Sequence, residues 1–198
     1  MSSDPRYILG LTGSLAMGKS TTAQMFRDAG IPVWDADASV HALYAADAPG
    51  SRAIAEIVPG AIGPAGVDRA KLVAAFATNP ALLPKIEARI HPLVAASRKD
   101  FLQRHPTGIV VLDVPLLFET GGESDCDGVV VVTAPSDAQR ARALARPGMT
   151  PERLDRLLAR QMPGAEKRRR ADFVIDTALG LEPARHAVHN ILEQIRAG

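Results

Sequence analysis

The sequence of 198 residues contains a single cysteine, Cys126, and no long hydrophobic run. One cysteine excludes an internal disulfide and fits a reducing compartment, and no motif around it indicates a catalytic thiol. No apolar stretch approaches the ~18 residues that a membrane span needs, and Met1 to Arg6 are polar. We therefore expect a cytoplasmic protein with no membrane partner, as a monomer or weak homo-oligomer.

The chain also lacks a charge excess, since its net charge is +1. This excludes a broad electrostatic surface for nucleic acid, so any anion site must be local. The one dense basic run, Lys167–Arg170, precedes Asp172 and an apolar segment, which is more typical of a solvated helix end than of a nucleic-acid patch. We expect no nucleic-acid partner.

Five short apolar runs predict strands, at residues 7–11, 31–34, 109–112, 128–132 and 173–175. Strands that are apolar almost throughout are typical of a parallel sheet covered on both faces. Helical patterns alternate with them, at residues 20–29, 39–46, 69–77, 82–103, 136–144, 150–160 and 183–196. The alternation predicts an α/β fold, a five-stranded parallel sheet flanked by helices, in one domain over 1–198.

The stretch 47–108 departs from this alternation, because about sixty mostly helical residues separate the second and third strands. That is too much chain for one crossover. We expect an inserted helical subdomain there, well placed to hold a second substrate.

Residues 13–20 match the pattern G-x-x-x-x-G-K-S and lie between an apolar strand and a helical segment. A glycine-rich turn that feeds a helix N-terminus directs backbone N–H groups at phosphates. Lys19 would reach the β- and γ-phosphates, and the Ser20 hydroxyl would bind Mg²⁺. The predicted nucleotide-binding residues are Gly13, Ser14, Leu15, Ala16, Met17, Gly18, Lys19, Ser20 and Thr21. The alternative is a glycine turn beside a solvated lysine.

Acidic residues recur where the predicted strands end, which is the edge at which open α/β sheets bind ligands. Asp113 follows four apolar residues, as in a Walker B strand whose carboxylate holds magnesium, although an aspartate there can also cap a turn. Asp35 and Asp37 follow the second strand. Either could accept the proton of an attacking hydroxyl, or both could cap a helix, and spacing does not choose between them.

Arg140, Arg142 and Arg146 run into the turn Pro147-Gly148. Arginines on a mobile segment can close over a triphosphate, which predicts a lid region at 138–165 with Arg142 and Arg146 facing one another at i, i+4. A solvated helix face is the alternative.

Taken together, the chain resembles the dephospho-coenzyme A kinase family over nearly its whole length. The resemblance rests on the phosphate loop and, in order, on Asp35-Ala36-Asp37, His91-Pro92-Leu93, Val114 to Glu119, Arg160-Gln161-Met162-Pro163, Lys167-Arg168 and Ala171 to Asp176. It implies a P-loop fold like that of the nucleoside-monophosphate kinases, with ATP and Mg²⁺ as cofactors. The implied reaction is phosphorylation of the ribose 3′-hydroxyl of dephospho-CoA, the last step of CoA biosynthesis.

The resemblance also implies roles for individual residues. Asp37 would be the base with Asp35 in support, and Lys19, Arg142 and Arg146 would act on the phosphates. The dephospho-CoA side would be lined by His91, Pro115, Leu116 and Glu119. From composition alone, His91 would instead be a structural histidine before Pro92, and Leu116 to Phe118 would be core.

One position departs from the family pattern, because Ala16 stands where a glycine is usual. Glycine there allows close backbone approach or a positive φ, so alanine fits well only if its φ is negative. We expect ATP to bind somewhat more weakly than it would to an Ala16→Gly variant.

Two other functions stay open at this stage. The first is a kinase for another small acceptor, such as a nucleoside monophosphate or shikimate. The second is a nucleotide switch or RNA-binding P-loop protein that uses Lys167–Arg170, although the chain has no Asn-Lys-x-Asp guanine motif.

Overall fold

A computed structural model describes residues 5–198, which form two compact units. The first, here the sheet unit, holds the described residues up to Trp34 and from His105 onward. The second, the helical unit, is Asp35–Arg104. The helical unit thus starts and ends somewhat earlier than the 47–108 insertion that the sequence suggests, because the helix after the second strand belongs to it.

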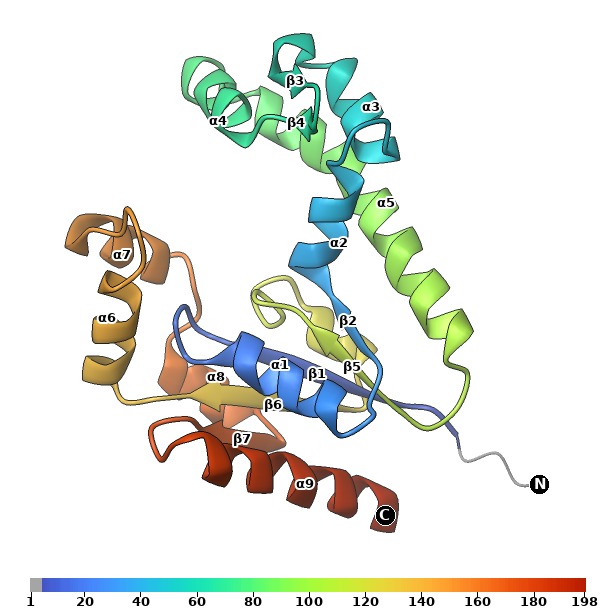
Figure 1. The fold of residues 1–198 in the computed structure, drawn as a ribbon, viewed down its shortest axis with the longest axis vertical. Helices are drawn as coiled ribbons and strands as arrows, with labels where there is room; N and C mark the ends of the chain where they lie inside the picture. The colour runs from blue at the N-terminus through green and yellow to red at the C-terminus, as the bar shows by residue number, and fades with distance from the viewer. Residues whose placement is uncertain (1–4) are drawn as a thin grey trace. The chain divides into compact units, whose positions relative to one another are not determined.

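The sheet unit is built on five strands in the order β2-β5-β1-β6-β7 (Figure 1). They are β2 (Val33–Asp35), β5 (Ile109–Asp113), β1 (Tyr7–Gly13), β6 (Gly128–Thr133) and β7 (Phe173–Asp176). The strand β1 pairs in parallel with β5 and β6, and β6 pairs in parallel with β7. The predicted five-stranded parallel sheet is confirmed, and β1 ends between the ends of β5 and β6.

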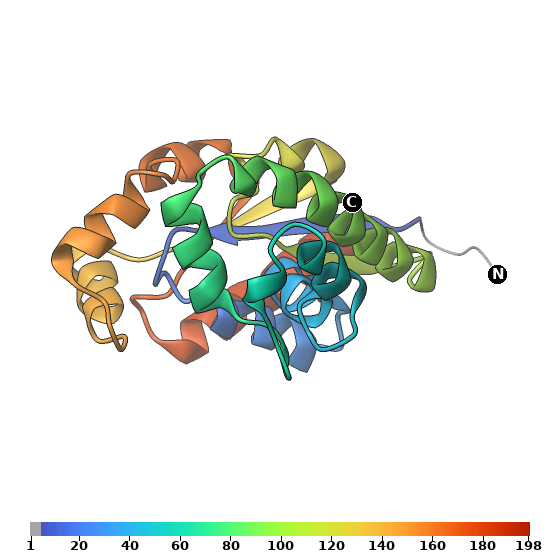
Figure 2. The ribbon, with the colours of Figure 1, turned by 90° about the horizontal axis from the view of Figure 1, so that it is seen from above.

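Helices cover both faces of this sheet (Figure 2). Along β6, Val130 and Val132 join a core with α1 (Lys19–Asp28) and α9 (Leu181–Ala197). Val129 and Val131 point the other way and pack with Leu117, and α8 (Gly164–Arg170) lies against β6. Because successive side chains of a strand alternate between faces, a doubly covered strand must be apolar at every position.

Two further helices follow β6, namely α6 (Ser136–Leu144) and α7 (Pro151–Leu158). The start of α7 follows from local sequence, because the Thr150 side chain accepts a hydrogen bond from Arg153 N and Pro151 stands at the first helical position. Leu154 and Ala143 are fully buried in a small apolar cluster. This cluster also contains Ala16 of the phosphate loop. The helices α6 and α7, which overlap the predicted lid region 138–165, therefore pack on the loop.

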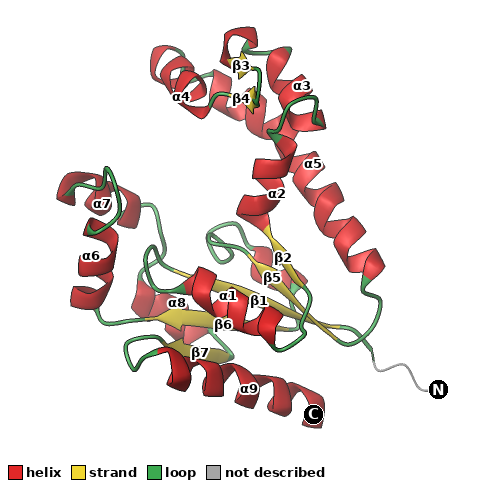
Figure 3. Ribbon diagram, viewed as in Figure 1, coloured by secondary structure: helices red, strands yellow, loops and turns green. Residues whose placement is uncertain are grey.

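The helical unit contains four helices, a short hairpin and one 3-10 turn (Figure 3). Its helices are α2 (Ala36–Leu43), α3 (Pro49–Ala55), α4 (Arg69–Thr78) and α5 (Leu82–Arg104). The hairpin β3 (Ile62–Gly63) and β4 (Gly66–Val67) needs glycine at 66, where φ is +105° and a Cβ would lie 2.1 Å from Tyr44 O. The unit has its own core, made of Ile54, Ala61, Leu72, Ile86 and Ile90.

Candidate active site

The predicted phosphate loop occupies the turn between β1 and α1. Gly18 is the N-cap of α1, at φ +92°, and no side chain caps the helix. The uncapped N–H groups of the first turn are therefore available to an anion. Gly18 also faces Thr177, since a Cβ on it would lie 3.1 Å from Thr177 Cγ2. Both conformation and space thus favour glycine at this position.

Ala16 adopts φ +61°, the left-handed region that favours glycine. The negative φ at which alanine would fit without strain is therefore not the one found. The conformation costs an L-residue about 1 kcal/mol or more. The Ala16 side chain is 7% exposed and packs with Ala143 of α6 and Leu154 of α7. Burial of the methyl against these helices offsets part of the backbone strain.

Lys19 and Asp113 form an ion pair between the first residue of α1 and the last residue of β5. The register explains the meeting, because Leu11 of β1 pairs with Asp113 and the loop returns over that strand end. Asp113 is 1% exposed, so its charge lies in a poorly hydrated place that a cation stabilises. The structure therefore brings together the predicted phosphate-binding lysine and the predicted magnesium carboxylate.

A magnesium site here would use few protein ligands. Among residues 5–198 there is no group of three or more His, Cys, Asp or Glu side chains that could hold a metal. Mg²⁺ bound with a nucleotide keeps several waters and takes one or two side-chain oxygens plus phosphate oxygens. Ser20 is exposed in the first turn of α1, and Asp113 supplies the carboxylate at the β5 end. Oxygen donors of this kind suit a hard cation such as Mg²⁺.

Asp35 and Asp37 have different surroundings. Asp35 is the N-cap of α2, and its carboxylate accepts a hydrogen bond from Ala38 N at 2.9 Å. Asp37 stands in the first turn of the same helix and is exposed. Within residues 5–198 its carboxylate has neither a hydrogen-bond nor an ion-pair partner. The capping alternative thus describes Asp35, while the Asp37 carboxylate is free for another use.

His91 lies within α5, directly before Pro92. Its side chain is exposed and, like that of Asp37, has no polar partner in the described chain. A structural histidine would fill the core or cap a neighbour. The structural alternative therefore finds no support in its surroundings.

The turn Pro115–Glu119 is held in place by contacts with α8, with Met162 and with β1. Lys167 of α8 is fully buried and lies 2.9 Å from Glu119 Oε1, and that oxygen also accepts a hydrogen bond from Met162 N at 2.7 Å. The Pro115 carbonyl accepts hydrogen bonds from Thr12 Oγ1 and Lys167 Nζ. Leu116 is 41% exposed at the front of the turn, whereas Leu117 and Phe118 are core.

The burial of Lys167 corrects one expectation from the sequence. The run Lys167–Arg170 is a solvated helix end only in its three arginines, which are exposed. On the outer side of α8, a hydrogen bond from Arg170 lowers the pKa of the Glu166 carboxyl. A count of charges in the run could not separate the buried cation from the exposed ones, because only the Glu119 partner distinguishes them.

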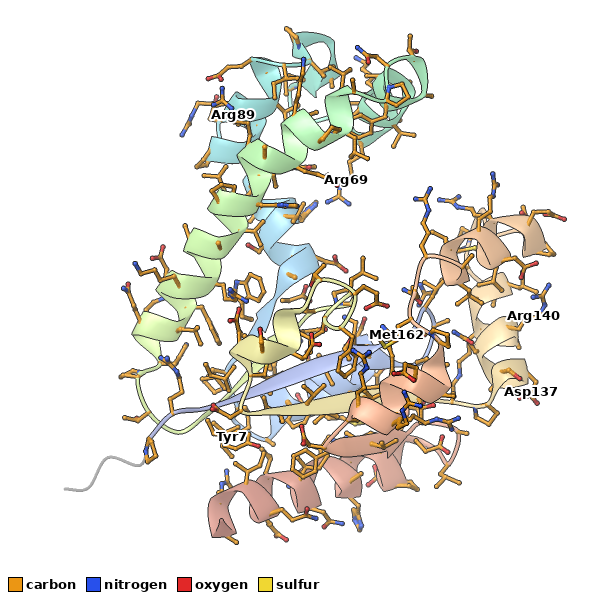
Figure 4. The ribbon with its side chains drawn as sticks, turned by 180° about the vertical axis from the view of Figure 1, so that it is seen from behind. Tyr7, Arg69, Arg89, Asp137, Arg140 and Met162 are labelled. Carbon is orange, nitrogen blue, oxygen red and sulfur yellow. The ribbon has the colours of Figure 1, made fainter. Side chains whose placement is uncertain are left out.

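The three arginines of the predicted lid, Arg140, Arg142 and Arg146, lie in different surroundings. Figure 4 shows Arg140 on the outer side of α6, where it pairs with Asp155 of α7 at 3.0 Å. Arg142 donates two hydrogen bonds to Thr177, at 2.8 Å to its hydroxyl and 3.0 Å to its carbonyl. The Thr177 hydroxyl in turn donates to Met17 O at 2.9 Å. Arg142 is therefore connected to the phosphate loop through one side chain.

A cavity of about 240 Å³ adjoins the loop on this side. It is lined by Gly18, Thr21, Arg142, Arg146 and Leu181, among others. Arg146 lies beyond the end of α6, so it reaches the cavity from the following turn. The segment after β7, Thr177 to Leu181, was missed by sequence reasoning. No motif marks it, and only its place at a strand end beside the loop could have suggested it.

Comparisons with known proteins point to one family. A family model described as dephospho-CoA kinase matches residues 7–182. The dephospho-CoA kinase of Mesorhizobium japonicum is 54% identical over 192 residues, which cover 96% of each chain.

Two solved structures share the fold. A crystal structure of TT1252 from Thermus thermophilus has a TM-score of 0.82 at 32% identity, covering 96% of this chain and 98% of that one. A dephospho-CoA kinase from Campylobacter jejuni has a TM-score of 0.68 at 20% identity, covering 98% and 99%.

Proposed function

The chain belongs to the dephospho-CoA kinase family, and from that membership we propose that it transfers the γ-phosphoryl group of ATP to the ribose 3′-hydroxyl of dephospho-CoA. The product is CoA, and the reaction is the last step of CoA biosynthesis. The observation that carries the proposal is the extent of the family match, which includes both the phosphate loop and the whole helical unit.

On the nucleotide side, the residues Gly13 to Thr21 bind the phosphates of ATP. Lys19 neutralises charge on the β- and γ-phosphates, where phosphoryl transfer depends on positioning and electrostatic stabilisation. The 240 Å³ cavity takes the nucleoside, with Arg142 and Arg146 in its wall. The uncapped N-terminus of α1 and the Lys19–Asp113 pair support this assignment.

We extend the proposal to Mg²⁺, held by Ser20 and, directly or through water, by Asp113. Bound there, Mg²⁺ supplies charge neutralisation between the phosphates. The protein's own part is to present one hydroxyl and one poorly hydrated carboxylate at the loop.

On the acceptor side, Asp37 accepts the proton of the attacking 3′-hydroxyl. Its free carboxylate supports this choice over Asp35, which caps α2. His91, Pro115 and Leu116 contact dephospho-CoA. Glu119 contributes indirectly, by holding the Pro115–Glu119 turn in place, because Lys167 and Met162 N already occupy its carboxylate. The region 138–165 closes over the nucleotide as a lid.

The described helices include none that is both long and apolar enough to cross a membrane. We propose further that the enzyme works in the cytoplasm, as a monomer or weak homo-oligomer, on two small molecules and with no nucleic acid. The near-neutral net charge and the presence of one cysteine, which excludes an internal disulfide, support these assignments.

The direct test is incubation with ATP, Mg²⁺ and dephospho-CoA, with CoA detected by mass. A Lys19→Met variant serves as the inactive control, and a panel containing a nucleoside monophosphate and shikimate tests the acceptor by ADP release. CoA formation that needs both Mg²⁺ and Lys19 supports the proposal. No CoA from folded protein, or faster turnover of another acceptor, contradicts it.

A further inference from the structure

Two glutamines from opposite ends of the lid region bond the same residue of the phosphate loop. Gln139 of α6 donates from Nε2 to Leu15 O at 2.8 Å. Gln161, which follows α7, accepts through Oε1 from Leu15 N at 3.0 Å. Both amide orientations are fixed by chemistry, because a carbonyl can only accept and an N–H can only donate. Leu15 thus has both of its backbone polar groups satisfied by these two side chains.

The bond from Gln139 also determines where the next backbone N–H points. All described peptide bonds are trans, so the C=O of Leu15 and the N–H of Ala16 point in opposite directions. Holding the carbonyl toward α6 turns the Ala16 N–H away from that helix. Ala16 is the residue whose φ of +61° strains the loop, so an unaided alanine would favour another conformation.

We propose that Gln139 and Gln161 are positioning residues that hold the phosphate loop in the shape that binds ATP. The loop needs these two hydrogen bonds because Ala16 is strained, whereas a glycine would adopt the same φ without strain. Gln139 is 8% exposed, so its amide is committed to the loop rather than to solvent. Neither glutamine needs to touch the nucleotide, because each acts through the Leu15 backbone.

Gln161 connects this loop to a second part of the sheet unit. Its neighbour Met162, labelled in Figure 4, donates its N–H to Glu119 at the end of the Pro115–Glu119 turn. Two successive residues therefore hold the phosphate loop and that turn. Both glutamines and Met162 line a cavity of about 390 Å³ beside the loop, which leaves space around the two amides.

The first test removes each hydrogen bond with little change in shape, in the variants Gln139→Met and Gln161→Met. Binding of ATP is measured by titration without acceptor, so the result does not depend on the proposed acceptor. Loss of one neutral hydrogen bond should weaken ATP binding about fivefold in each variant, with KM for dephospho-CoA unchanged. Gln194→Met, on the exposed side of α9, makes the same chemical change away from the site and should alter nothing.

A second pair of variants separates positioning from mere loss of packing. Gln161→Glu keeps an acceptor for Leu15 N, whereas Gln139→Glu places a carboxylate against the Leu15 carbonyl. Both add the same charge beside the loop, so their difference reports the hydrogen bond. We expect ATP to bind about tenfold more weakly to Gln139→Glu than to Gln161→Glu.

Unchanged ATP affinity in both methionine variants, or equal affinity in the two glutamate variants, would overturn the inference. If a variant is too unstable to titrate, amide hydrogen exchange decides. The Leu15 N–H should exchange faster in Gln161→Met than in wild type, and equal rates refute the bond. A chain that binds ATP through this loop but makes no CoA would contradict the proposed function and leave this inference standing.

Discussion

The candidate site residues of the two units differ in how far they are fixed before any substrate binds. In the sheet unit, Lys19 is paired with Asp113, Glu119 with Lys167, and Arg142 with Thr177. In the helical unit, Asp37 and His91 are exposed, and in the described chain they have no polar partner. These side chains of the sheet unit are thus preorganised, which lowers the entropy cost of binding, while Asp37 and His91 have no such preorganisation.

The largest effect should come from Asp37→Asn, which removes the proposed base without changing shape. We expect kcat to fall by about 10²–10⁴, the usual contribution of general-base catalysis, with ATP affinity unchanged. Asp35→Asn is the matched control, because asparagine caps a helix as well as aspartate does. A loss confined to ATP binding, or a larger kcat loss in Asp35→Asn, would remove Asp37 from the role.

Lys167→Met tests how firmly the sheet unit fixes its polar groups. Removing one partner of a buried pair leaves the other charge uncompensated, so the free energy of unfolding should fall by about 3 kcal/mol. Chemical denaturation measures this. Adding Glu119→Gln to the same protein should restore much of the loss, since the double variant has no unpaired charge. Additive losses in the double variant would show that the two side chains do not act as a pair.

His91→Ala tests a candidate site residue of the helical unit, for which we expect an effect on substrate binding and none on folding. An exposed side chain without partners contributes little to folding, so the melting temperature should stay the same. We expect KM for dephospho-CoA to rise about tenfold with ATP affinity unchanged, as for one lost polar contact to a charged ligand. His189, exposed on α9, offers the control His189→Ala. Equal steady-state constants in wild type and His91→Ala would argue against a substrate contact.

The smallest effect should come from Ala16→Gly. Relief of the positive φ and loss of a buried methyl oppose each other, each at about 1 kcal/mol, so stability should barely change. ATP binding should strengthen by about two- to fivefold, because the glycine loop adjusts around phosphate without strain. Titration with ATP measures the affinity. Equal or tighter ATP binding by wild type would contradict the prediction that Ala16 weakens it.

Much of the fold follows from the sequence, since each apolar run predicted as a strand lies within two residues of an observed one. Local sequence patterns predicted less of the secondary structure in the helical unit. None of the predicted helices covers α3, which begins with Pro49 at its first position, where a missing N–H costs nothing. The hairpin β3–β4 has two-residue strands, too short for any periodicity.

The site shows the same division between local and distant causes. The phosphate loop and the carboxylate of Asp113 could be predicted from the sequence, because phosphate binding requires particular residue types in a fixed local order. The buried state of Lys167 depends on Glu119, 48 positions away, and the role of Gln139 depends on Leu15, 124 positions away. Contacts of that kind have no local signature. Spacing alone likewise could not separate Asp37 from Asp35. The resemblance to the family favours Asp37, and the observed start of α2, where Asp35 is the N-cap, supports that choice.

The buried amine of Lys167 also gives this protein a built-in reporter. Amine-directed reagents modify exposed lysines quickly, but Lys167 is 0% exposed and pairs with a carboxylate. It becomes reactive only when α8 leaves the sheet, so its labelling rate measures how often that part of the sheet unit opens. Comparing the rate with and without ATP would show whether nucleotide binding stiffens α8.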